Sequence, residues 1–443
     1  MREPEQEAAW VRLALSRRGL VALIGVALVV RVLALVVSDA LDPARTGEAW
    51  EWGQEMACMA RSIAVDGVHG DPWGDDTGPS AWLTPLYPAL MAVCIKLAGG
   101  INATAAALLF ACQIVFSIGT GLLLLSFGRA LRAPAAGVIA AWIFVLMPAS
   151  IWNSAHTVWD TSAVALGLLA FLTFALKVGP RPKLPQTFAL GAAFGGVLFL
   201  NPAVATFGPG VLLFLRAGSD EEPEVGGGRL ARWCVFSAGS LLLCLPWMLR
   251  NHAVIGTLGL RSNLGVELRV GNNDQAQGRH EVLYHPSHTP AELARYRELG
   301  EREFNRSSGA AAREWVIANP GRFTELSLYR AFLFWFGESP AMDPRGNGRE
   351  SSAQLALGWA KWAMHSVVGL LALLCLFRFA RGHVARPLVL TGCLLFPLPY
   401  YVTHVAERYR FPIEPLLVFI VVWVALSLWN SRKLRGRTRS ING

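Results

Sequence analysis

Apolar runs long enough to cross a lipid bilayer recur along the whole chain of 443 residues. Residues 19–38 form the first such run, and residues 387–403 form one near the other end. About 20 apolar residues in a helix span the hydrocarbon core of a bilayer. Only 16% of the residues are charged, against roughly 25% in an average soluble domain. This pattern predicts a multi-span helical membrane protein and excludes a soluble enzyme, a disordered chain and a disulfide scaffold.

The predicted membrane part has about ten transmembrane helices. The expected spans are 19–38, 103–127, 134–151, 160–177, 186–201, 203–217, 232–249, 355–378, 387–403 and 412–430. Residues 83–97 are apolar but short and contain two prolines, which predicts a re-entrant or interfacial helix. The aromatic-rich segment 326–336 is also expected at the interface. The expected fold is an all-α polytopic membrane protein with juxtamembrane helices on its outer face.

The distribution of the net charge of +9 predicts the orientation of the chain. Basic residues cluster before the first span, in alternate short connections and in the tail: Arg12, Arg17, Arg18, Arg129, Arg132, Lys177, Arg181, Lys183, Arg229, Arg232, Arg378, Arg381, Arg386, Arg432, Lys433, Arg435, Arg437 and Arg439. The positive-inside rule then places both termini in the cytoplasm, and no nucleic-acid partner is needed to explain the charge. The first apolar run is too long for a cleavable signal, and no small-residue cleavage site follows it cleanly.

Two longer polar segments, 39–102 and 250–354, are expected to face outward, and both are too long to be mere connections. The chain therefore divides into an N-terminal membrane half at 1–249, an extracytoplasmic insertion at 250–354, and C-terminal spans with a basic tail at 355–443. The first outer segment is acidic, which contrasts with the basic inner connections. Any chemistry is expected on the outer face.

Carboxylates in these outer parts have two possible roles. Residues 47–63 show helical spacing, with apolar residues on one side and Glu48, Glu51 and Glu55 on another, which predicts an amphipathic helix on the membrane surface. These acids either complement the helix dipole or supply a general base at the membrane surface. Asp160, at the outer start of a span, either caps the helix or lines an outward cavity.

Several arginines stand where a membrane protein has few. Arg31 lies within the first span, so it needs a polar partner or must extend outward to the interface. Arg408 and Arg410 lie in a short outer loop, and Arg250 ends a span at the outer face. The loop arginines either bind an anion such as a lipid phosphate or pair with Glu407 and the acidic first loop.

Motifs for other chemistries are missing from the sequence. It contains no P-loop, nucleophile elbow, HExxH or dinucleotide-binding fingerprint. Its histidines lack metal-ligand spacing, and its seven cysteines include no CxxC pair and lie mostly in apolar stretches. No cofactor and no metal site are therefore predicted.

Seven short motifs remain, and their order along the chain is distinctive. They are Trp50-Glu51-Trp52-Gly53, residues 77–82 leading into Pro85-Leu86-Tyr87-Pro88, Lys96-Leu97-Ala98-Gly99, Trp159-Asp160-Thr161, residues 246–251, Gly271-Asn272-Asn273 and residues 408–412. With this order and spacing, nearly the whole chain resembles the GT-C membrane glycosyltransferases. The similarity is to the branch of the protein O-mannosyltransferases and the lipid A aminoarabinose transferases.

The resemblance implies transfer of a sugar from a polyprenyl-phosphate donor on the extracytoplasmic face of a bacterial inner membrane. The acceptor would be a glycan, a lipid or a protein. Such enzymes place an acidic base in the first outer loop, and Glu51 matches that position best. Many relatives carry an Asp-Glu pair that is missing here, so Glu48 and Glu55 stay as rivals. The second carboxylate of the family matches Asp160.

The chemistry of this transfer suits the residues available. An acceptor hydroxyl or amine loses its proton as it attacks the anomeric carbon, with inversion, and the departing phosphate needs charge stabilisation. The resemblance implies that Arg408, Arg410 and Arg250 hold the donor phosphate and that Tyr87, His404 and Tyr409 line the pocket. Some relatives use a divalent metal, but no ligand set is recognised in this chain.

A transporter or flippase for a lipid-linked sugar is the competing function. Such proteins also have intramembrane charges and broken helices, but their sites lie near the midplane between inverted repeats. No inverted repeat is visible in this sequence, and the two large outer segments favour the transferase. The transferase requires Glu51, Asp160 and the loop with Arg408 and Arg410 around one outward cavity.

Overall fold

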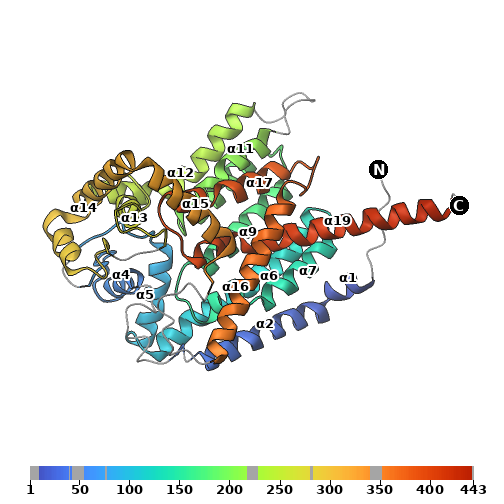
Figure 1. Ribbon diagram of the computed structural model, residues 1–443, viewed down its shortest axis with the longest axis horizontal. Helices are drawn as coiled ribbons and strands as arrows, with labels where there is room; N and C mark the ends of the chain where they lie inside the picture. The colour runs from blue at the N-terminus through green and yellow to red at the C-terminus, as the bar shows by residue number, and fades with distance from the viewer. Residues whose placement is uncertain are drawn as a thin grey trace.

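The computed structural model describes residues 9–38, 40–41, 54–74, 77–216, 228–279, 283–339 and 352–441 (Figure 1). Within these ranges every regular element is a helix, and β-structure is limited to isolated bridges such as the one between Arg279 and Val405. The predicted all-α class is therefore confirmed.

The helices follow one another with short connections. They are α1 (Ala9–Ala14), α2 (Arg17–Val37), α4 (Glu55–Asp66), α5 (Leu86–Ala98), α6 (Ala103–Ala130), α7 (Pro134–Leu146), α8 (Pro148–Ala155), α9 (Thr161–Val178), α10 (Leu184–Leu198), η1 (Pro202–Phe207), α11 (Gly208–Arg216), α12 (Arg229–Ile255), α13 (Leu264–Gly271), α14 (Pro290–Ala318), α15 (Pro320–Phe336), α16 (Ser352–Leu376), α17 (Arg386–Leu395), α18 (Leu398–Val402), η3 (Glu407–Ile413) and α19 (Glu414–Ile441).

Six helices in the described part of the chain are long and apolar enough to cross a membrane. They are α2, α6, α9, α12, the stretch Gly358–Leu376 of α16, and the continuous stretch Glu407–Arg432 of η3 and α19. The pair α7 and α8, bent by 56°, adds a seventh if it is one broken span. The remaining expected spans form shorter helices: α10, with 15 residues, covers less than the roughly 30 Å hydrocarbon core.

The short apolar segment that was expected to be re-entrant or interfacial forms α5, which packs against α4. Helix α4 begins at Glu55 and buries Met56 and Met59, two of the residues expected on its apolar side. The preceding part of the predicted amphipathic helix lies outside the described residues.

The two ends of the molecule contain different helices and connections. Figure 1 shows both termini at one end, whereas α4, α5, α13 and α14 gather at the other. Helix α1 packs on α7, and the positive charge of Arg132 acts on His383. The basic connections near these residues therefore lie together at the end with the termini, as the positive-inside pattern requires.

A buried glutamate ties the polar end of the molecule together. Glu301 of α14 accepts hydrogen bonds from the Ala81 backbone at 2.8 Å, from Ser262 at 2.6 Å and from the Tyr296 hydroxyl at 2.8 Å. The three donors come from the first outer segment, from the segment before α13 and from α14 itself. This carboxylate therefore joins the two outer segments into one cap.

Glycine at the end of α13 allows a close approach that shapes the site described below. A Cβ atom at Gly271 would lie 1.7 Å from the backbone oxygen of Thr403. Only glycine fits at this distance, so the segment that contains Thr403 and His404 can lie directly against α13. The turn motif Gly271-Asn272-Asn273 thus has a packing reason.

Candidate active site

Segments that are far apart in the sequence bring charged side chains together at the polar end of the bundle. Glu55 begins α4, Asp160 directly precedes α9, and Arg261 and Glu267 come from the stretch around the start of α13. Arg408 lies in η3 at the start of the last long apolar helix. Arg261 pairs directly with Asp160 at 3.3 Å, and the charges of both arginines act on all three carboxylates, so the five side chains lie within electrostatic reach of one another.

Asp160 is held by several polar neighbours. Its Oδ2 atom lies 3.3 Å from Nη2 of Arg261 and accepts a hydrogen bond of 3.3 Å from the Asn201 amide. Arg261 Nη2 also reaches the Thr84 hydroxyl at 3.5 Å. Burial raises the pKa of Asp160, and the charges of Arg261 and Arg408 oppose that rise. Asp160 makes no capping hydrogen bond to α9, so the cap interpretation does not account for this residue.

Arg408 has aromatic neighbours. Its guanidinium carbon lies 4.0 Å from the ring centre of Trp159 and 5.2 Å from that of Tyr409. Such cation–π contacts hold the guanidinium plane while its N–H groups stay available. Arg408 is half-buried, and its charge acts on Glu55, Asp160 and Glu267.

Glu55 is the carboxylate of the site with the fewest polar partners among the described residues. In the part of the chain that the structure describes, it makes no hydrogen bond or ion pair to another side chain. Burial raises its pKa, while its own backbone N–H and the charges of Arg408 and Arg261 act in the opposite direction. A carboxylate with a raised pKa and no fixed partner has the properties of a general base.

Glu267 is a third carboxylate at the site. Burial and, to a smaller extent, the negative charge of Glu55 raise its pKa to about 7, against the charges of Arg261 and Arg408. Its Oε1 atom accepts a hydrogen bond of 2.7 Å from the Asn263 amide. The negative charge of Glu55 therefore opposes ionisation of Glu267.

Aromatic and imidazole side chains lie along one side of the candidate site. Nε2 of His404 lies 2.8 Å from the Tyr409 hydroxyl oxygen, and Nδ1 lies 3.5 Å from Oε2 of Glu267. The Tyr409 ring stacks on Tyr400, with ring centres 4.6 Å apart. His404 and Tyr409 thus lie where the pocket was predicted.

Other predicted residues have different surroundings. Arg410 is 1% exposed and is bound by both carboxylate oxygens of Glu414, at 2.7 and 2.8 Å, and by the carbonyls of Trp335 and His365. Its donors are used within the bundle, so the structure does not place it with Arg408. The ion pair with Glu414, four residues later, explains why Arg408 and Arg410 have different surroundings.

Arg250 also uses its N–H groups to bind backbone carbonyls. Its guanidinium donates to the carbonyl of Ser80 at 2.7 Å and to that of His69 at 2.8 Å. It therefore anchors the first outer segment to α12, and the structure does not bring it to Asp160 and Arg408. Tyr87 is 2% exposed, and its hydroxyl lies within the electrostatic reach of Asp160, so it is near the site. Glu48 and Glu51 lie outside the described residues.

Sequence reasoning missed Arg261 and Glu267. Arg261 stands in an outward segment, where the argument that singled out Arg408 applies equally. Glu267 has no local signal because it occupies an ordinary position in a short helix. Within the described ranges, no group of three or more histidine, cysteine or acidic side chains has a geometry that could hold a metal ion.

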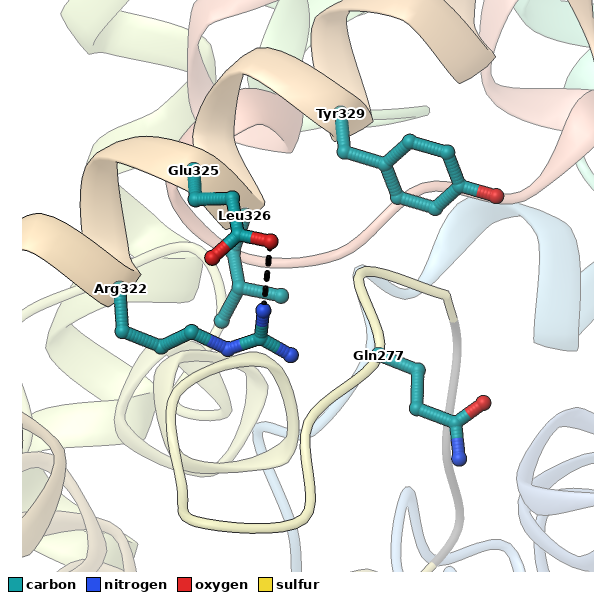
Figure 2. Close-up of a pocket in the computed structure, with 5 residues that line it drawn as sticks. All are labelled: Gln277, Arg322, Glu325, Leu326 and Tyr329. Carbon is teal, nitrogen blue, oxygen red and sulfur yellow. Dashed lines mark ion pairs between the residues drawn. The ribbon is translucent and has the colours of Figure 1, made fainter.

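A hollow beside α15 lies apart from these residues. Figure 2 shows Arg322, Glu325, Leu326 and Tyr329 of that helix facing Gln277. Arg322 and Glu325 form an ion pair of 2.8 Å across its wall. The carboxylates described above do not line this hollow.

Comparison with known proteins gives a resemblance in shape only. No protein-family model and no curated protein matches the chain. The oligosaccharyltransferase of Archaeoglobus fulgidus in complex with Zn and sulfate is 12% identical, with a TM-score of 0.46 over 92% of this chain and 50% of that chain. AglB from Archaeoglobus fulgidus with an inhibitory peptide and a dolichol-phosphate is also 12% identical, with a TM-score of 0.44 over 94% of this chain and 52% of that chain. The chain thus spans about half the length of these archaeal proteins, and the function has to be argued from the site.

Proposed function

We propose that the protein is a membrane glycosyltransferase of the GT-C type. It would move a sugar from a polyprenyl-phosphate donor to an acceptor hydroxyl or amine, with inversion, on the extracytoplasmic side of a bacterial inner membrane. On the resemblance of its motifs, we further propose the branch of the O-mannosyltransferases and aminoarabinose transferases. The observation that carries the proposal is the pair Arg261 and Arg408 beside the carboxylates Glu55 and Asp160.

The reaction divides naturally among these residues. Arg261 and Arg408 supply N–H groups and positive charge for the donor phosphate as it departs. Glu55 is the base that takes the proton of the acceptor, because its carboxylate has no other partner among the described residues. Asp160 holds Arg261 at 3.3 Å and thereby positions the phosphate site. This assignment prefers Glu55 to Glu51, and it leaves Arg250 and Arg410 with structural roles.

The position of the charges favours the transferase over the transporter. Asp160 directly precedes α9, and Arg408 is the second residue of the long apolar stretch Glu407–Arg432. The charges therefore lie at the ends of spans, whereas a transporter site lies near the bilayer midplane. The lipid tail of the donor would extend along the exposed apolar helices.

The test compares the wild type with Glu55→Gln in nanodiscs, with radiolabelled polyprenyl-phosphate sugars and acceptors from a membrane extract. Loss of the base is expected to reduce transfer roughly 100-fold or more while donor binding persists. Glu303→Gln is the matched control, because Glu303 pairs with Arg306 on the exposed side of α14. Glu51→Gln and Glu48→Gln are assayed in parallel.

Two outcomes would overturn parts of this proposal. Normal transfer by Glu55→Gln together with loss in Glu51→Gln or Glu48→Gln would move the base to that residue. No transfer and no donor binding by the wild type for any lipid-linked sugar would contradict the enzyme function, and transport assays would follow.

A further inference from the structure

Glu267, His404 and Tyr409 form a row of polar contacts along one wall of the site. Nε2 of His404 lies 2.8 Å from the Tyr409 hydroxyl oxygen, and its Nδ1 atom faces the Glu267 carboxylate at 3.5 Å. His404 is 2% exposed, whereas Tyr409 is only half-buried. The charges of Glu55, Glu267, Arg261 and Arg408 all act on the Tyr409 hydroxyl. This hydroxyl therefore belongs to the space where substrate would bind.

The protonation of His404 follows from its surroundings. Burial, together with the charges of Arg408, His285 and Arg330, lowers its pKa to about 3. A neutral imidazole has one N–H group and one nitrogen that accepts a hydrogen bond. The ring is also hydrogen-bonded to the backbone of Glu267, so Glu267 offers it acceptors from both its carboxylate and its main chain. The proton then lies on Nδ1, and Nε2 accepts from Tyr409.

This arrangement determines what the tyrosine oxygen offers to a substrate. A tyrosine hydroxyl has a single hydrogen to donate and two lone pairs to accept with. Because the hydrogen is directed at His404, the oxygen presents lone pairs to the site. Lone pairs attract an O–H or N–H group and repel a phosphate oxygen.

We propose that Glu267 and His404 hold the Tyr409 hydroxyl as a hydrogen-bond acceptor for a hydroxyl group of the substrate. The site then has two sides: Arg261 and Arg408 take the phosphate, and Tyr409 takes a hydroxyl of the transferred sugar or of the acceptor. Tyr409 is a binding residue, whereas His404 and Glu267 are positioning residues. The identity of the ligand rests on the proposed function, but the direction of the hydrogen bond does not.

The direction of the hydrogen bond is measured directly by ¹⁵N NMR of histidine-labelled protein in nanodiscs. The signal of His404 among the nine histidines is identified by its loss in His404→Gln. We expect a neutral ring protonated at Nδ1, with an Nε2 shift that changes in Tyr409→Phe. The control is Tyr401→Phe, which removes a hydroxyl bonded to Trp335 at 2.7 Å and should leave the His404 signal unchanged. A ring protonated at Nε2, or an imidazolium, overturns the inference.

Kinetics test the substrate side. Tyr409→Phe should raise the KM of the hydroxyl-bearing substrate about tenfold, because one hydrogen bond is lost. The affinity for polyprenyl phosphate that carries no sugar should stay unchanged. Donors with single deoxy positions and the acceptor are titrated separately, so the KM that moves identifies the source of the hydroxyl. An unchanged KM for both substrates contradicts the inference.

Two substitutions of His404 separate positioning from proton transfer. A glutamine offers one acceptor and N–H donors, as the neutral imidazole does, so His404→Gln should stay within a few-fold of the wild type. His404→Leu offers neither and should resemble Tyr409→Phe. Equal losses in both variants would overturn the positioning role. If the wild type transfers no sugar, the proposed function fails while the NMR result still decides the inference.

Discussion

At the scale of single residues, Glu55 and Asp160 differ in their surroundings and therefore in their roles. Asp160 is ion-paired with Arg261 and hydrogen-bonded to Asn201. Glu55 has neither kind of partner among the described side chains. Burial raises the pKa of both carboxylates, so it is the difference in bound partners that leads us to propose Glu55 as the base and Asp160 as the group that holds Arg261.

The pH dependence of transfer should report the base. Glu55 acts when deprotonated, so kcat/KM is expected to rise with pH through a pKa above its ordinary value of 4.5. Arg261→Gln removes a positive charge that favours the carboxylate, and this rising limb should shift to higher pH. Glu267→Gln removes a negative charge, and the limb should shift to lower pH.

Arg306→Gln serves as the control for these profiles, because its partner Glu303 lies in an exposed pair on α14. The measurement is kcat/KM from pH 4 to pH 9 at constant ionic strength, where roughly 0.1 M salt limits effects from distant charges. A limb that stays in place in both site variants would contradict Glu55 as the titrating group.

At the scale of elements, Arg31 explains how a broken helix pair survives in the bundle. Helix α7 ends at Leu146 and α8 begins at Pro148, which has no N–H group to continue the helix. Arg31 of α2 donates to the carbonyl of Val145 at 3.0 Å and to three serine hydroxyls, those of Ser117, Ser150 and Ser154. Arg31 was expected either to have a polar partner or to extend to the interface, and the structure shows that it has buried polar partners.

Substitution of this arginine should loosen the bundle. Arg31→Leu leaves the Val145 carbonyl without its donor in an apolar surrounding, and we expect a loss of about 1–3 kcal/mol of stability. Arg31→Lys keeps the charge and three donors and should fall between Arg31→Leu and the wild type. Thermal unfolding in detergent measures the change, and Val29→Leu on the exposed face of α2 is the control. Equal stability of Arg31→Leu and the wild type would contradict this role.

At the scale of the whole molecule, the cap and the termini occupy opposite ends (Figure 1). The basic connections lie near the termini, and the candidate site lies under the cap formed by α4, α13 and α14. With the positive-inside rule, this arrangement predicts that the site faces the outer side of the membrane, as we propose.

Labelling with a membrane-impermeant maleimide tests that orientation. In a background whose native cysteines are replaced by alanine, Arg313→Cys on the exposed surface of α14 should react in intact spheroplasts. Arg432→Cys near the C-terminal end should react only after permeabilisation. The reverse pattern would place the cap in the cytoplasm and contradict an extracytoplasmic transferase.

Local pattern was enough to predict much of this protein. Hydropathy and helical spacing are properties of neighbouring residues, so they predicted the all-α class, the long apolar helices and the apolar side of α4. The motif residues Asp160, His404, Arg408 and Tyr409 also lie at one site.

The tertiary structure decided which charges meet. Asp160 pairs with Arg261, 101 positions later in the sequence, and His404 meets Glu267 because Gly271 allows the chain to pass close by. Arg410 stands two residues from Arg408, yet its donors are taken by Glu414 in the next turn. An arginine looks the same in the sequence whether its partner is a protein carboxylate or a bound anion. Only the arrangement in space determines which groups remain available, because electrostatic energy depends on distance and burial rather than on sequence separation.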